Sequence, residues 1–193
     1  MAGELDVSSW ATGLRVPRIL WAALLGSCVV YAGLVASGMF VAGREEPIVL
    51  DVPMALVFLA GAIASGVASF VVPKILLTQA LAHAAPPRIE EREDPTGQTL
   101  FRDASARTAF FADPPAVRRL FLLRFHTALI LSLALSEAIA IFGLAGHVAG
   151  MLPMPVALAF IGVGALLQVL RFPHPARCEA ICERTWGARF PPE

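Results

Sequence analysis

The chain has 193 residues, of which 57% are hydrophobic and 16% are charged, and its 15 basic and 15 acidic side chains leave no formal net charge. Soluble domains carry about a quarter charged residues, so this composition is typical of a protein embedded in a membrane. The balanced charge provides no basic surface for nucleic acid, and we expect no such partner. The three cysteines do not form a disulfide framework.

Four apolar stretches are long enough to cross a lipid bilayer as helices. They cover residues 19–42, 53–83, 118–146 and 153–171. The first contains 24 residues without a charge, well beyond the apolar run of about 7 to 15 residues in a signal peptide, so we favour an uncleaved helix. In the second, Pro73 interrupts the helical pattern and predicts a kink.

The three longest segments outside the spans are polar: an N-terminal segment (1–18), a connection (84–117) and a tail (173–193). Part of the connection has an apolar helical face, which predicts either a helix lying on the membrane surface or a solvated loop. That face consists of Leu100, Phe101, Ala104, Thr108 and Phe111. The expected fold is all-α, an integral membrane four-helix bundle built from two hairpins.

The basic residues predict the orientation of this bundle. With four spans, every Lys and Arg except Arg44 lies on the same side as the two termini. Because basic residues are enriched on the cytoplasmic side, we expect both termini in the cytoplasm and a multi-pass protein of the bacterial inner membrane. Arg118, Arg119 and Arg124 cluster at the start of the third span. They either determine topology, which we favour, or bind anionic lipid headgroups.

Glu137 is a carboxylic acid within the apolar third span. An acidic residue at the centre of a membrane helix costs about 2.5 to 3.5 kcal/mol, so it needs a partner, a wet cavity or a proton. The polar residues available on the other spans are Tyr31, Ser65, Ser69 and Gln168. None of these is basic, so we expect Glu137 to hold a proton, hydrogen-bonded to Gln168 or a backbone carbonyl as a link between helices.

Residues 134–144, Ala-Leu-Ser-Glu-Ala-Ile-Ala-Ile-Phe-Gly-Leu, resemble the carboxylate-bearing helix of the c subunits of rotary ATP synthases. The resemblance implies that Glu137 binds a transported proton or sodium ion, with Ser136 as a hydrogen-bond neighbour. Gln168 is a further candidate for this ion site. The overall layout also resembles small uncharacterised four-helix bacterial membrane proteins, which implies nothing about mechanism.

We expect a non-enzymatic protein that packs with itself or with partner membrane helices as a structural or assembly subunit; the alternative is the proton- or sodium-binding subunit. Small residues provide close helix contacts: Gly33, Ser37, Gly61, Ser65, Gly162 and Ala165. Catalytic motifs are missing from the sequence, so no catalytic residue or cofactor is expected. His174, Cys178 and Cys182 are spaced like ligands on one helical face, but a reduced cytoplasmic tail without metal is favoured.

Overall fold

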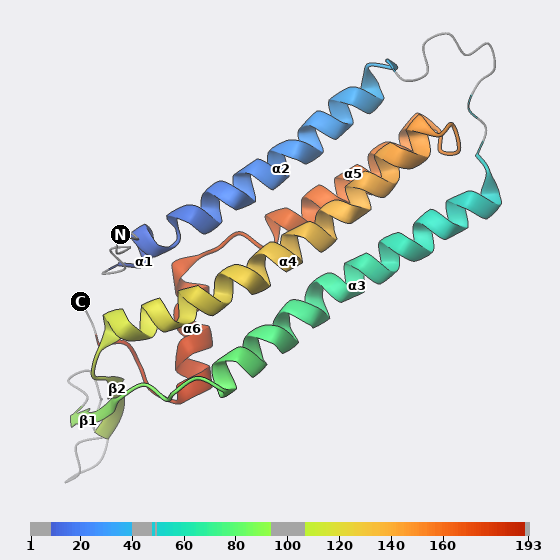
Figure 1. The fold of residues 1–193 in the computed structure, drawn as a ribbon. Helices are drawn as coiled ribbons and strands as arrows, with labels where there is room; N and C mark the ends of the chain where they lie inside the picture. Colours follow the sequence, from blue (N-terminus) through green and yellow to red (C-terminus); the bar gives the residue numbers. More distant parts are fainter. Residues whose placement is uncertain (1–8, 40–47, 49, 94–106, 192–193) are drawn as a thin grey trace, which may run out of the picture. The chain divides into compact units, whose positions relative to one another are not determined.

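The computed structural model describes residues 9–39, 48, 50–93 and 107–191 (Figure 1). These residues are mostly helical and form two compact units. The first, which we call the helix unit, contains residues 16–39, 50–77 and 126–172. The second, the sheet unit, contains residues 9–15, 78–93, 107–125 and 173–191. Each unit is described separately below.

Four helices run through the helix unit: α2 (Arg15–Ala36), α3 (Val52–Ala82), α4 (Pro114–Val148) and α5 (Met154–Val169). In the described part of the chain, three helical stretches are long and apolar enough to cross a membrane, namely Trp10–Ala36, Val52–Ala82 and Pro114–Val148. The apolar helix α5 is shorter, at 16 residues. This arrangement is compatible with a membrane helical bundle, as the composition predicts.

Local signals explain where α3 and α4 begin. The Asp51 carboxylate accepts a hydrogen bond from the backbone N–H of Met54 (3.2 Å), and the Asp113 carboxylate accepts one from Ala116 (3.0 Å). Each aspartate therefore caps backbone N–H groups that have no partner inside the helix. Helix α3 continues through Pro73 to Ala82. Residues 40–42, the expected end of the first span, lie outside the described residues.

A tight turn joins α4 to α5. Gly150 has a φ of 77°, a conformation that side chains with a Cβ rarely adopt. The backbone N–H groups of Met151 and Leu152 both donate to the Gly146 carbonyl, at 2.9 and 3.0 Å. His147 Nδ1 lies 3.0 Å from the Leu152 carbonyl oxygen. These contacts fix the reversal of the chain between the two helices.

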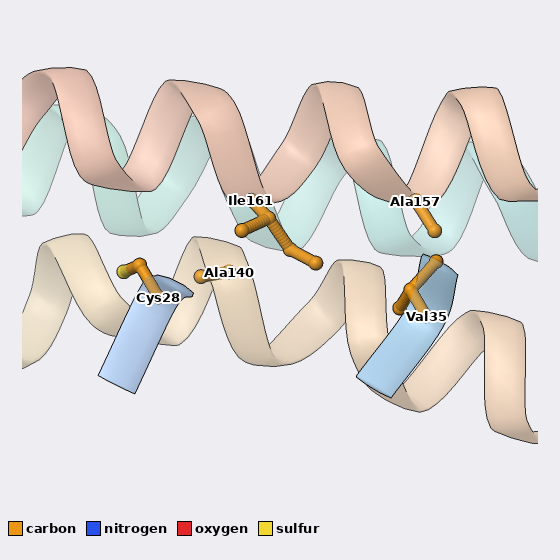
Figure 2. Close-up of a cluster of buried hydrophobic side chains, with 5 residues drawn as sticks. All are labelled: Cys28, Val35, Ala140, Ala157 and Ile161. Atoms are coloured by element: carbon orange, nitrogen blue, oxygen red, sulfur yellow. The ribbon is translucent and has the colours of Figure 1, made fainter. Parts of the chain in front are cut away.

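The core of the helix unit is formed by small and branched side chains from three helices (Figure 2). Cys28 and Val35 come from α2, Ala140 from α4, and Ala157 and Ile161 from α5. All five are buried. Their small volumes allow the helix backbones to approach closely, which is how membrane helices gain packing energy.

The sheet unit adds one pair of strands to a chain whose described residues are otherwise mostly helical, as expected. Strand β1 (Ile89–Glu93) pairs antiparallel with β2 (Arg107–Phe111), with Ile89 opposite Phe111. The predicted surface-helix face is therefore wrong at Thr108 and Phe111, which lie in β2; its other three members lie outside the described residues. The reason is long-range pairing, because the Arg189 backbone also bonds to Phe111 (3.0 Å) and Ala109 (2.8 Å) on the other edge of β2.

Aromatic rings hold the sheet unit together around a buried arginine. Trp10, in the short helix α1 (Trp10–Gly13), packs edge-on against Phe121 and Phe190 at ring-centroid distances of 5.8 and 5.9 Å. The Arg118 guanidinium lies over the rings of Trp10 (5.9 Å) and Phe190 (5.6 Å). Cation–π contacts of this kind stabilise a desolvated arginine by roughly 1 to 2 kcal/mol. The unit thus joins the N-terminal segment to the tail.

Helix α6 (Pro175–Trp186) turns Cys178 and Cys182 inward, where both are buried. Burial raises the pKa of the Cys182 thiol above its ordinary value of 9.0, and the neighbouring Cys178 adds to the effect. A neutral, inaccessible thiol is a poor nucleophile. Cys28 is buried as well.

We therefore expect a hydrophilic thiol reagent to leave the native chain unmodified, even at pH 9, and to modify all three cysteines after denaturation, as measured by mass spectrometry. Because the unfolded Cys182 thiol ionises above about pH 8.5 to 9 and the folded one does not, the stability of this unit should fall as the pH rises past that value. Rapid modification of Cys182 in the native chain would contradict its buried position.

Candidate functional site

Glu137 of α4 forms hydrogen bonds with two hydroxyl groups of α2. Its Oε1 lies 2.5 Å from Ser27 Oγ and 3.0 Å from Tyr31 Oη. Ser27 and Tyr31 are four residues apart, so they project from the same face of α2. Glu137 itself is half-buried. The carboxyl group therefore links α4 to α2 within the chain.

The Ser27 hydroxyl has two oxygen neighbours but only one hydrogen. Its Oγ lies 2.6 Å from the Leu24 carbonyl oxygen as well as 2.5 Å from Glu137 Oε1. A carbonyl oxygen and an ionised carboxylate can only accept hydrogen bonds. The single hydrogen of the Ser27 hydroxyl can form a full hydrogen bond in only one of these two short contacts. If Glu137 is ionised, the other contact joins two oxygen atoms with no hydrogen between them.

This link lies well inside both helices. Ser27 is twelve residues after Arg15, the first residue of α2, and nine before Ala36, about 18 and 14 Å along the axis. Glu137 is eleven residues before Val148, about 16 Å from that end of α4. The carboxyl group is therefore far from both ends of α2.

A second polar cluster surrounds Arg171, which follows α5 and is buried. Its Nη1 donates to the Ser136 hydroxyl and to the Ser132 carbonyl (3.4 Å), and its Nη2 donates to the Ser69 hydroxyl (2.7 Å). The guanidinium also lies 4.3 Å from the centre of the Phe70 ring. Arg171 thus ties the end of α5 to both α3 and α4.

The serine hydroxyl groups in this cluster can accept hydrogen bonds from Arg171. The Ser136 hydroxyl donates to the Ser132 carbonyl (2.8 Å), and the Ser69 hydroxyl donates to the Gly66 carbonyl (2.5 Å). Each hydroxyl therefore has its lone pairs available for Arg171. In contrast to Ser27, each of these two serine hydroxyl groups has one acceptor for its single hydrogen.

The three residues expected to form an ion site have different partners. Glu137 contacts α2, whereas the Ser136 hydroxyl contacts Arg171 and Ser132. Gln168 is fully buried, and its Nε2 lies 3.6 Å from Cys28 Sγ. Its backbone carbonyl accepts a hydrogen bond from Trp21 Nε1 (2.7 Å). Among the described residues, the hydroxyl groups that contact Glu137 are those of Ser27 and Tyr31.

The small residues expected at helix contacts fall into two groups. Gly61 faces the Phe142 ring, 3.2 Å from where a Cβ would lie, and Ala165 packs against the core cluster; Ser65 is half-buried. In contrast, Gly33 and Gly162 have no heavy atom within 4 Å of a Cβ position. Ser37 is exposed and donates to its own helix. Gly33 and Gly162 therefore make no close helix contact with the residues that the structure describes.

Two other glycines provide the closest approach between α4 and α5. A Cβ on Gly143 would lie 2.6 Å from the Ala157 carbonyl oxygen, and one on Gly164 would lie 2.9 Å from the Ser136 carbonyl oxygen. Sequence reasoning missed both residues. The available signal was their identity as glycines within apolar helices, where Gly is otherwise unfavourable.

The three arginines expected near lipid headgroups are placed differently from one another. Arg118 is buried between aromatic rings. Arg124 Nε donates to the Ala80 carbonyl (2.8 Å) and so caps the end of α3. Arg119 is exposed. Of the three, Arg119 is the one whose side chain is exposed in the described structure.

The cysteine and histidine residues of the tail do not converge. His174 is exposed at the start of α6, whereas Cys178 and Cys182 are buried. Within the described residues, no group of three His, Cys, Asp or Glu side chains is placed to hold a metal ion.

Comparisons with family models, with curated proteins and with solved structures found no match to this chain.

Proposed function

We propose that this chain is a non-enzymatic, multi-pass protein of the bacterial inner membrane that packs with itself or with partner membrane helices. In this proposal α2, α3, α4 and α5 are the four spans and both termini are cytoplasmic, in accord with the distribution of basic residues. The 16 residues of α5 cover about 24 Å, and the adjoining Pro153 and Leu170–Arg171 segments supply the remainder.

The observation that carries this proposal is the bond between Glu137 and α2. Both hydroxyl partners of the carboxyl group belong to the same chain. A polar group with internal partners is a link between helices, worth about 0.5 to 2 kcal/mol in a membrane. The open space around Gly33 and Gly162 leaves room for a further helix to approach α2 or α5.

A specific observation favours a second candidate, a proton-binding membrane subunit. If the missing hydrogen lies on Glu137, the carboxyl group donates to Ser27, Ser27 donates to Leu24, and Tyr31 donates to Glu137. Every hydrogen is then used once. A carboxyl group that holds a proton well inside the spans is a candidate carrier.

Glu137→Gln separates the two candidates, because an amide also donates and accepts hydrogen bonds. A structural link predicts that this variant folds, assembles and supports the same proton flux as wild type in liposomes. A carrier predicts normal assembly, as judged by size-exclusion chromatography, with loss of flux. Glu137→Leu is the control that removes the hydrogen bonds, and it should destabilise the chain by about 1 to 2 kcal/mol. Loss of assembly in Glu137→Gln would contradict both candidates.

A further inference from the structure

The helix unit contains an apolar groove of about 520 Å³ between α3 and α5, with Ile139 of α4 at its base. One wall is α3 from Leu59 to Phe70, and the other is α5 from Ala159 to Leu167. Every residue that lines the groove is apolar. The α3 wall spans twelve residues, about 16 Å along the helix. The size and chemistry suit a hydrocarbon chain.

At one end of the groove, each wall ends near a positively charged side chain. On α3, Ile63, Gly66 and Phe70 follow one another at three- and four-residue spacing, and the exposed Lys74 continues this stripe. On the other wall, the Arg171 guanidinium lies 3.5 Å from the Leu167 carbonyl oxygen and 4.3 Å from the centre of the Phe70 ring. Leu167 and Phe70 both line the groove.

Aromatic and basic side chains gather beside this end of the groove. Trp21 packs edge-on against Phe172 with ring centroids 5.0 Å apart, and the Arg18 guanidinium lies 5.6 Å from the Phe172 ring centre. Tryptophan and arginine side chains gather where the hydrocarbon meets the headgroups. Two cations above an apolar groove are complementary to a ligand with an anionic head and a hydrocarbon tail.

We propose that this groove binds an anionic phospholipid, with one acyl chain between α3 and α5 and the phosphate next to Lys74. Arg171 remains in its hydrogen bonds with the serines and contributes a fixed positive charge nearby, which acts strongly because the surroundings have a low dielectric constant. The site requires only that the helix unit lies in a membrane, and it does not depend on whether Glu137 is protonated.

The test is binding of phosphatidylglycerol and of phosphatidylcholine to the purified full chain in detergent, measured by native mass spectrometry. We expect wild type to bind phosphatidylglycerol several-fold more tightly. Val163→Trp fills the groove from an exposed position and should reduce this binding about tenfold, whereas Val29→Trp, at an exposed position on α2, should leave it unchanged. Lys74→Gln should weaken binding about fivefold, and Lys74→Arg should restore it.

Equal binding of the two lipids would overturn the proposal, as would a preference for phosphatidylglycerol that Val163→Trp does not alter. Size-exclusion chromatography of the same variants tests the competing occupant, a second copy of the chain. A change in oligomeric state in Val163→Trp with unchanged lipid binding would assign the groove to that copy and refute the lipid site. Because Glu137 is unchanged in all these proteins, none of these results decides between the two functions proposed above.

Discussion

Arg171→Ala is expected to destabilise the helix unit by about 2 to 4 kcal/mol. The substitution removes a buried cation that donates to Ser69, Ser136 and the Ser132 carbonyl, and it removes the cation–π contact with Phe70. Hydrogen bonds to charged groups are worth about 1.5 to 3 kcal/mol, and truncation also leaves a cavity among three helices. Equilibrium unfolding of the purified protein in mixed micelles measures the loss.

Arg18→Ala is the matched control for this prediction. Its guanidinium lies over the Phe172 ring at 5.6 Å, and its side chain is only partly buried. We expect a loss of about 0.5 to 1 kcal/mol. If the two variants lose the same stability, Arg171 is not the tie between α3, α4 and α5 that its hydrogen bonds indicate.

Gly143→Ala is expected to cost about 2 to 3 kcal/mol, although it adds a single methyl group. The new Cβ would lie 2.6 Å from the Ala157 carbonyl oxygen and 2.7 Å from the Phe160 Cβ. Neither neighbour is the flexible end of a side chain, so α5 must move away from α4, and overpacking of this kind costs about 1 to 3 kcal/mol. The same unfolding measurement applies.

Gly162→Ala controls for the intrinsic preference of helices for alanine. No heavy atom lies within 4 Å of its Cβ position, so the substitution should be neutral or stabilise the protein by up to about 1 kcal/mol. If Gly143→Ala is as well tolerated as Gly162→Ala, then α4 and α5 are not in close contact at Gly143.

The long apolar helices could be predicted because they depend on local properties. Length, apolar composition and the prolines and aspartates near helix starts are all visible in the sequence, and the long apolar helices follow from them. Strand β2 could not be predicted in this way. Its partners are residues 89–93 and Arg189, which are remote in sequence, so local periodicity carries no information about the pairing.

The contacts in the two polar clusters could be predicted only in part from the sequence. Tyr31 was among the expected partners of Glu137 because it is a polar residue in an apolar span. Ser27, one turn earlier on the same face, was missed. Arg171 at the end of a span suggests a headgroup contact, yet it turns into the helix unit because serines from α3 and α4 meet there. These serines come together through tertiary packing, which local sequence patterns do not reveal.

Both functions proposed above depend on the link between Glu137 of α4 and the hydroxyl groups of α2, and the hydrogen count at Ser27 predicts that the linking carboxyl group is protonated. The infrared difference spectrum between wild type and Glu137→Gln, recorded in lipid at neutral pH, tests it most directly. We expect the variant to lose the carbonyl band of a protonated carboxylic acid, whereas Glu91→Gln, a substitution at an exposed acid in β1, should lose the bands of an ionised carboxylate. Loss of ionised-carboxylate bands in Glu137→Gln would contradict this prediction.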